Sequence, residues 1–443
     1  MNRLTQTPAK ALIAGLTLFT FFALALLPAR AVEIQTVTSE KGVTALLVED
    51  YTVPIVALQF SFKGGSLQDA DGKEGTARLL TTLLDEGAGD IESKAFQEKL
   101  DEVGVEYSFN ASLDNFSGGI KALRINFVES ADMLALMLNK PRFDADPIER
   151  MKTSALTNLR RQENNPRTLS AKALREATFG DHPYARPSEG TAETIEAISV
   201  DDLRGYKDKV FARDNLVIGV VGAISADELK PILDAVFASL PEKADLRAIP
   251  EATIEAGKSI HVDLNVPQTT IGFVMPGLKR DDPDFFAAYL VNHVLGGGSF
   301  SSRLYEEVRE KRGLAYGVYS FLGTYDYAGT VGAGSATNAA AAQQTIDIMR
   351  AEMKRMGEEG PTAEELEKAK KFIIGTYAIS NLDSSSKIAS VLVAIQQADL
   401  GLDYIDRRED YLNQVTLEQA KRVANELFGG EPTQVTVGQK LTN

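Results

Sequence analysis

Several residue types with distinctive chemistry are scarce in this chain. It contains no cysteine, which excludes disulfides, thiolate metal ligands and thiol nucleophiles. It has only three histidines in 443 residues, His182, His261 and His293, and they lie far apart. No H-x-x-x-H or H-x-x-E pair is present, so histidines at the spacing of a helical metal site are missing. Each histidine is therefore expected to be an ordinary structural residue.

Positive charge is also in short supply. The chain has 47 Lys and Arg residues against 62 Asp and Glu residues, a formal net charge of −15. Such a chain repels phosphate backbones, which disfavours nucleic-acid binding. The acidic surplus is typical of a solvated surface, and it would also attract a basic peptide.

The N-terminus resembles a targeting segment. Arg3 and Lys10 precede an uncharged apolar run over residues 11–27, and Ala29-Arg30-Ala31 supplies small residues at a cleavage site. We expect residues 1–31 to be a cleaved secretory signal, with a retained membrane anchor as the alternative. Secretion without cysteine fits a bacterial periplasmic protein, with no membrane contact after cleavage.

The remaining chain, roughly 410 residues long, is expected to form two domains. Val53-Pro54 has a counterpart in Val266-Pro267, and the capping box that begins at Ser199 has one at Thr416. The shift between such pairs stays near 210 residues through the same order of elements, which indicates an internal duplication. Strand pairs alternate with helices in each copy, so the expected fold is α+β. We expect two tandem homologous domains, each a largely antiparallel sheet packed with helices, forming a clamshell.

The expected domain boundaries follow from this repeat. The first domain spans 32–240 and the second 259–443. Residues 241–258 are charged, contain two prolines and have no sustained apolar period, as an exposed linker does. Among the elements expected in the first copy are a helix over 75–84, a strand over 119–127 and a long helix that Asp146-Pro147 opens and that ends near Asn164.

The most distinctive stretch is residues 295–327, LGGGSFSSRLYEEVREKRGLAYGVYSFLGTYDY. A glycine triplet ends one helix, a charged helix is expected over 302–311, and an aromatic strand follows Gly313. Arg309 and Tyr316 stand seven residues apart across this helix-to-strand turn, so both side chains can face one cavity. No Gly-Lys-Ser/Thr follows the glycines, which excludes a phosphate-binding P-loop.

This stretch resembles the second half of the insulinase/pitrilysin-type peptidases, whose zinc site carries an inverted H-x-x-E-H motif. The resemblance implies that Arg309 and Tyr316 are auxiliary catalytic residues, which bind substrate and stabilise the reaction intermediate. It extends over nearly the whole mature chain. The chain is similar to the non-zinc-binding subunits of two-subunit bacterial peptidases and of the mitochondrial processing peptidase.

The zinc ligands that this resemblance would require are missing. The corresponding helix reads GTARLLTTLL from Gly75, which places Arg78 and Thr82 in the two histidine slots and Thr81 in the glutamate slot. Counting back from Pro166 places the third ligand slot near Asn158. Arginine stays protonated and threonine is a poor zinc ligand, so we expect these degenerate slots to hold no metal.

The resemblance also implies substrate-binding positions. The strand around Asn110 and Ala111 resembles the edge strand to which an extended peptide adds by main-chain hydrogen bonds. Gly296, Gly297 and Gly298 occupy the place of the family's glycine-rich loop, which is linked to substrate handling.

Three functions remain open. The first is the zinc-lacking subunit of a heterodimeric periplasmic metallopeptidase, whose homologous partner carries the zinc. The second is a non-catalytic peptide-binding or scaffold protein on the same fold. The third is a peptidase that acts alone through an unrecognised metal site.

Overall fold

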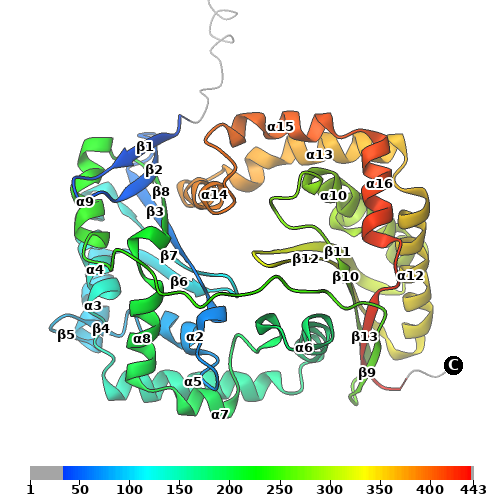
Figure 1. The fold of residues 1–443 in the computed structure, drawn as a ribbon, viewed down its shortest axis with the longest axis horizontal. Coiled ribbons are helices and arrows are strands. Elements are labelled where there is room, and N and C mark those ends of the chain that lie inside the picture. Colours follow the sequence, from blue (N-terminus) through cyan, green and yellow to red (C-terminus); the bar gives the residue numbers. More distant parts are fainter. Residues whose placement is uncertain (1–32, 441–443) are drawn as a thin grey trace, which may run out of the picture.

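The computed structural model describes residues 33–440, and the expected signal segment lies outside them. Figure 1 shows two sheets side by side, one formed by the first half of the chain and one by the second. Helices cover both faces of each sheet, which confirms the α+β clamshell of two homologous domains. No helix within residues 33–440 is both long and apolar enough to cross a membrane.

The first sheet has six strands, and all neighbours are antiparallel except β2 and β8. In spatial order the strands are β1 (Gln35–Thr38), β2 (Thr44–Glu49), β8 (Leu216–Gly222), β3 (Ile55–Lys63), β7 (Asn115–Leu123) and β6 (Glu106–Ala111). A separate pair is formed by β4 (Gly87–Ala88) and β5 (Ile91–Glu92).

The second sheet has five strands and repeats this arrangement. In spatial order the strands are β9 (Ser259–Asp263), β13 (Thr433–Gly438), β10 (Gln268–Pro276), β12 (Ala328–Asn338) and β11 (Ala315–Tyr325). Only β9 and β13 are parallel, as only β2 and β8 are in the first sheet. The expected duplication therefore has the same topology in both copies.

The helices follow the same order in the two halves. Those of the first half are α2 (Thr76–Thr81), α3 (Ser93–Val103), α4 (Phe127–Asn139), α5 (Ala145–Gln162), α6 (Pro166–Phe179), α7 (Ala192–Ala197), α8 (Val200–Val210) and α9 (Ala226–Phe237). Those of the second half are α10 (Phe285–Asn292), α11 (Arg303–Tyr305), α12 (Ala342–Glu359), α13 (Ala363–Asn381), α14 (Ser385–Gln397), α15 (Tyr404–Gln414) and α16 (Leu417–Phe428).

Some expected boundaries are wrong. The strand expected over 119–127 is β7, which begins at Asn115 and ends at Leu123, because a short 3-10 turn leads from there into α4 at Phe127. The long helix α5 begins at Ala145, before Asp146. The capping box of α8 is confirmed, since the Ser199 hydroxyl accepts the Asp202 N–H and the Asp202 carboxylate accepts the Ser199 N–H.

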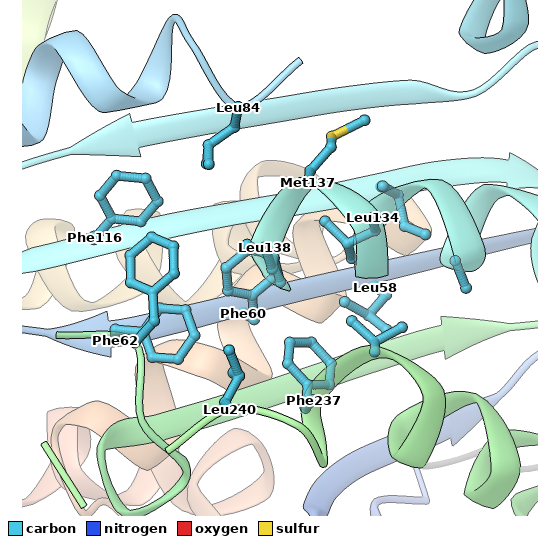
Figure 2. Close-up of a cluster of buried hydrophobic side chains, with 14 of the residues drawn as sticks. Leu58, Phe60, Phe62, Leu84, Phe116, Leu134, Met137, Leu138, Phe237 and Leu240 are labelled. Atoms are coloured by element: carbon cyan, nitrogen blue, oxygen red, sulfur yellow. The ribbon is translucent and has the colours of Figure 1, made fainter. Parts of the chain in front are cut away.

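Each half has its own apolar core. Alternate residues of β3, Leu58, Phe60 and Phe62, point to the face of the first sheet that α4 and α9 cover (Figure 2). These three side chains are at most 1% exposed. The corresponding cluster in the second half gathers around Phe273 of β10. Burying such aromatic side chains is what fixes each sheet against its outer helices.

The opposite face of each sheet is covered by a helix from the other half. Helix α14, from the second half, packs on β8 and β3 of the first sheet, and α6, from the first half, packs on β10 and β13 of the second (Figure 1). We call the face that carries this exchanged helix the inner face of its sheet. Because each half supplies a helix to the other, neither sheet is covered on both faces by its own half alone.

Residues 241–258 join the halves without a helix or strand. Where the halves meet, a small cluster surrounds Tyr184, whose side chain is fully buried. Its hydroxyl donates to Asp114 Oδ1 of the first half at 2.6 Å and accepts the Tyr327 N–H of the second half at 3.1 Å. The turn between β6 and β7 therefore lies against the turn between β11 and β12.

Candidate functional site

The first candidate site is built on α2, whose start is held by a buried carboxylate. Asp69 accepts the N–H groups of Gly75 and Ala77, each at 2.9 Å. Burial raises the pKa of Asp69 to about 7 despite these two donors. This contact fixes the orientation of the short helix that carries Arg78, Thr81 and Thr82.

The side chain of Arg78 is held between two polar partners. Its Nη1 donates to Asn110 Oδ1 of the edge strand β6 at 3.0 Å, and its Nε lies 3.3 Å from the Glu189 carboxylate. The arginine side chain remains 44% exposed. The guanidinium therefore places a fixed positive charge beside the free edge of the first sheet.

The hydroxyl groups of the two threonines donate hydrogen bonds to backbone carbonyls of the same helix. Thr81 Oγ1 donates to the Arg78 carbonyl at 2.7 Å, and Thr82 Oγ1 donates to the Leu79 carbonyl at 2.8 Å. Such bonds to the preceding turn are common for threonine in helices.

A pocket of about 230 Å³ lies between α2 and α5. It brings together Arg78, Thr82 and Asn158, three of the four degenerate metal slots, whereas Thr81 is not among its lining residues. Ser154 and Gln162 line it as well, at four-residue steps from Asn158 along α5. Sequence reasoning overlooked these two, although their helical spacing from Asn158 was a usable signal.

These residues do not fit a zinc ion. A guanidinium carries a permanent positive charge, and neither Thr82 nor Asn158 supplies the imidazole or carboxylate that zinc prefers. Glu189 is the one carboxylate that lines the pocket, and it is paired with Arg78. Within residues 33–440, no group of three or more His, Cys, Asp or Glu side chains could hold a metal ion.

The three histidines lie on different elements and have separate partners. His182 Nε2 lies 2.9 Å from the Pro250 carbonyl oxygen, and His261 Nδ1 lies 2.9 Å from Thr436 Oγ1. The ring of His293 packs against Phe372 with a centroid distance of 5.1 Å, and burial lowers its pKa. Each histidine thus has a structural role.

The second candidate site is the Arg309–Tyr316 pair, which the structure brings into contact. Arg309 Nη1 donates to the Tyr316 carbonyl at 3.0 Å, and the guanidinium carbon lies 4.3 Å from the centre of the Tyr316 ring. The same carbon lies 4.9 Å from the centre of the Tyr305 ring. Cation–π contact with two rings holds the guanidinium in place.

The Tyr316 side chain is 85% exposed, so its phenol is open to solvent or to a ligand. The helix expected over 302–311 is present as α11 followed by a π-helical segment, Glu306–Glu310. Since Arg309 lies on this segment and Tyr316 on β11, the helix-to-strand turn sets the geometry of the pair.

The glycine triplet lies at the end of α10. Residues His293–Gly297 form a π-helical segment against β11. A Cβ at Gly296 would lie 2.5 Å from the Ser320 nitrogen, so this position has no room for a side chain. At this position, packing against β11 accounts for the glycine without any contact to substrate.

The predicted substrate strand is an edge strand. Strand β6 pairs with β7 alone among the described strands, so one row of its backbone groups is free of sheet pairing. The Asn110 side chain is exposed, whereas Ala111 is 8% exposed and packs into the first core. Ala111 could therefore contact a peptide through its backbone only.

Two protein-family models match the chain. A model described as "Insulinase (Peptidase family M16)" matches residues 44–192, and one described as "Peptidase M16 inactive domain" matches residues 197–373. Together they span most of both halves.

Individual relatives extend the likeness over almost the full length. The chain is 26% identical over 401 residues to an "Uncharacterized zinc protease YmxG" of Bacillus subtilis, covering 89% of this chain and 96% of the relative. It is 26% identical over 366 residues to a "Non-peptidase homolog YmxG" of Helicobacter pylori, covering 82% and 84%.

Solved structures show the same fold. A crystal structure of a peptidase M16 inactive domain from Pseudomonas fluorescens superimposes with a TM-score of 0.87 at 29% identity, covering 93% of this chain and 99% of that one. A protease structure from Helicobacter pylori gives a TM-score of 0.78 at 22% identity, covering 92% and 99%.

Proposed function

We propose that this chain, a member of the insulinase-like M16 peptidase family, serves as the zinc-lacking subunit of a heterodimeric peptidase. A homologous partner would carry the zinc, and this chain would contribute Arg309 and Tyr316 to the binding of a peptide substrate. The observation that carries the proposal is the contact between these two side chains on an exposed surface, in a chain whose metal slots hold Arg78, Thr82 and Asn158.

The two residues have complementary chemical roles. The Arg309 guanidinium donates one hydrogen bond to the Tyr316 carbonyl, and within the described part of the chain it makes no other hydrogen bond. Its remaining donors suit a peptide carbonyl or carboxylate. The Tyr316 phenol can donate to an oxygen that gains negative charge during the reaction. Neither side chain is a nucleophile, so both act on a substrate that another group attacks.

The proposed location is the periplasm, with residues 1–31 as the secretion signal and a retained membrane anchor as the alternative. In the dimer, the second half of this chain would face the zinc-bearing half of the partner. No cofactor is assigned to this chain.

The test combines this chain with a relative that has an intact H-x-x-E-H motif and measures cleavage of an unstructured peptide. We expect cleavage by the mixture to exceed the sum of the two separate chains. Tyr316→Phe and Arg309→Ala should each lower the rate by about 100-fold, the usual effect of removing a group that stabilises a transition state. Arg312→Ala is the matched control, because Arg312 lies three residues away and pairs with Glu307 instead.

Two results would contradict this function. Equal rates for the mixture with wild-type chain, Arg309→Ala and Tyr316→Phe would remove the roles assigned to the pair. Chelator-sensitive cleavage by the pure chain would point instead to a peptidase that acts alone.

A second candidate function is a non-catalytic peptide-binding or scaffold protein. It is favoured by the exposed aromatic side chains of β11, since Tyr319 is 54% and Phe321 is 43% exposed. Exposed rings of this kind often mark a binding surface. Peptide binding without any cleavage by the mixture would select this function over the first.

A further inference from the structure

The pocket between α2 and α5 has the size of a binding site for part of a peptide. Its volume of about 230 Å³ lies below the range of roughly 300–1,000 Å³ that is usual for drug-sized ligands. Its lining is mixed: α5 supplies the polar side chains of Ser154, Asn158 and Gln162, and α2 supplies Arg78 and Thr82. The apolar lining residues are Leu79, Met151, Ala155, Leu159 and Ile195.

Arg78 is the one cationic side chain that lines this pocket. Of its five N–H donors, one is used by Asn110 and one faces Glu189. The other three make no hydrogen bond within residues 33–440. A planar guanidinium with free donors binds a carboxylate through two parallel hydrogen bonds.

We propose that this pocket binds a carboxylate group of an extended peptide that lies along β6. The inference rests on the proposed function, because it takes peptide binding by this chain as given. A single guanidinium matches the single charge of a carboxylate. The amides of Asn158 and Gln162 and the Ser154 hydroxyl supply uncharged donors for its second oxygen.

The position of Arg78 connects the pocket to the sheet edge. Its bond to Asn110 places the guanidinium beside the one strand of this sheet edge that can accept an added peptide. A peptide paired with β6 therefore passes the pocket, and either its C-terminal carboxylate or an Asp or Glu side chain can turn into it.

The Glu189 carboxylate would compete with a ligand carboxylate for the Arg78 guanidinium. Its carboxylate lies 3.3 Å from Arg78 Nε, and its side chain is 47% exposed, so it can turn toward solvent when a ligand carboxylate enters. Replacing Glu189 with glutamine removes the competing charge and keeps the shape. This variant should strengthen carboxylate binding.

The test uses three fluorescent versions of one unstructured ten-residue peptide and the whole chain, with affinity measured by fluorescence anisotropy. The first version has a free C-terminus and no acidic residue, the second is C-terminally amidated, and the third is amidated but carries one glutamate near its end. We expect the amidated acid-free peptide to bind about tenfold more weakly than at least one of the other two. Which of the two binds tightly identifies the source of the carboxylate.

Variants assign the effect to the pocket. Arg78→Gln should abolish the difference between the peptides, Arg78→Lys should restore part of it, and Glu189→Gln should enlarge it. Arg160→Gln is the matched control, because Arg160 is an exposed arginine of α5 that does not line the pocket. Circular dichroism checks that each variant is folded.

The outcomes separate this inference from the proposed function. Equal binding of all three peptides to the wild-type chain overturns the carboxylate pocket and leaves peptide binding intact. Binding of none of them also overturns the carboxylate pocket, and cleavage by the mixture with the zinc-bearing relative then decides the proposed function separately.

Discussion

The inner faces of the two sheets differ, although the sheets have the same topology. On the first sheet this face carries the polar side chains of Gln59, Ser61 and Asn110, and α14 adds a further amide through the Gln397–Ser61 hydrogen bond of 2.8 Å. On the second sheet it carries the rings of Tyr319 and Phe321, which lie across glycines of β12. The duplicated cores thus share a fold while the inner faces differ in chemistry.

The buried residues on the outer faces of the two sheets stabilise the fold, whereas the side chains on the inner faces differ between the halves. Phe60 and Phe273 occupy corresponding positions of β3 and β10, and both are buried against outer helices. One exchanged helix covers part of each inner face and leaves Tyr319 and Phe321 exposed. We infer that binding chemistry changed at such exposed positions because substitutions there cost little stability.

The largest expected effect tests whether the two halves fold as one unit. Phe60→Ala and Phe273→Ala should each lower the free energy of unfolding by about 3–5 kcal/mol, the usual cost of deleting a buried aromatic ring. Because α6 and α14 are exchanged, both variants should shift one common urea transition. Phe372→Ala, on a 53% exposed ring, is the control and should cost less than about 1 kcal/mol. Two separate transitions, of which each variant moves only one, would contradict the coupling.

Much of this coupling could not be predicted from the sequence. Local signals predicted the strand–helix order, the duplication and the capping box at Ser199, because these depend on spacing and on neighbouring residues. The exchange of α6 and α14 depends on contacts between residues far apart in the chain, such as Gln396 with Ile218 (178 positions) and Gln397 with Ser61 (336 positions), for which a single sequence carries no local signal. The end of β7 was missed for a similar reason, since the Arg124 N–H still bonds the Pro54 carbonyl in register, but Pro54 has no N–H to return and the ladder ends there.

The candidate sites show the same division. The spacing of Arg309 and Tyr316 across one turn predicted that both side chains face one cavity; their direct contact was not predicted. Counting from Pro166 selected Asn158, which lines the same pocket as Arg78 and Thr82. Glu189 was missed, because it reaches Arg78 from a loop that follows α6, and nothing in its surroundings marks it.

The second prediction compares the two contacts of the exchanged helices. A Cβ added at Gly219 would lie 2.4 Å from the Ala389 carbonyl oxygen of α14, which is backbone and cannot move without shifting the helix. At Gly272 the added Cβ would lie 2.5 Å from Leu174 Cδ1, the end of a side chain that can rotate. Gly219→Ala should therefore cost about 3 kcal/mol and Gly272→Ala about 1 kcal/mol in urea unfolding. If the two variants lose equal free energy of unfolding, the backbone of α14 shifts as easily as the Leu174 side chain rotates.

The third prediction concerns carboxylates at the starts of the corresponding helices α2 and α10. Burial raises the pKa of Asp69 to about 7, whereas Arg422 and Gln419 hold the pKa of Asp284 below its ordinary value. The folded state takes up a proton at Asp69 before the unfolded state does. Its contribution to stability therefore rises as the pH falls from about 7 toward 4, and the contribution of Asp284 is lost only below about 4.

Urea unfolding between pH 5 and pH 8 measures this contrast. Asp69→Asn should remove about 3 kcal/mol of the pH dependence between pH 5 and pH 8, since one pKa unit corresponds to about 1.4 kcal/mol. Asp284→Asn should leave the slope in this range unchanged. If the free energy of unfolding changes with pH equally in the wild-type chain and in Asp69→Asn, the buried carboxylate does not titrate near neutral pH.

The smallest expected effect asks whether the degenerate slots of the first half can again hold a metal. The Arg78→His, Thr82→His and Asn158→Glu substitutions together place two imidazoles four residues apart on α2 and a carboxylate across the same pocket. With zinc at ten times its dissociation constant, the triple variant should gain about 1.4 kcal/mol in the free energy of unfolding. The double variant that keeps Asn158 has two ligands only and should gain less.

Helix α10 of the second half, which corresponds to α2, is packed more tightly. Ala287, Ala288, Leu290 and Val291 are fully buried in the second core. Histidines at those positions would have to displace packed side chains. A zinc-dependent shift in the triple variant alone would therefore show that the duplication left the room for a metal in one half only. The absence of any shift would mean that Asn158 is not the third slot.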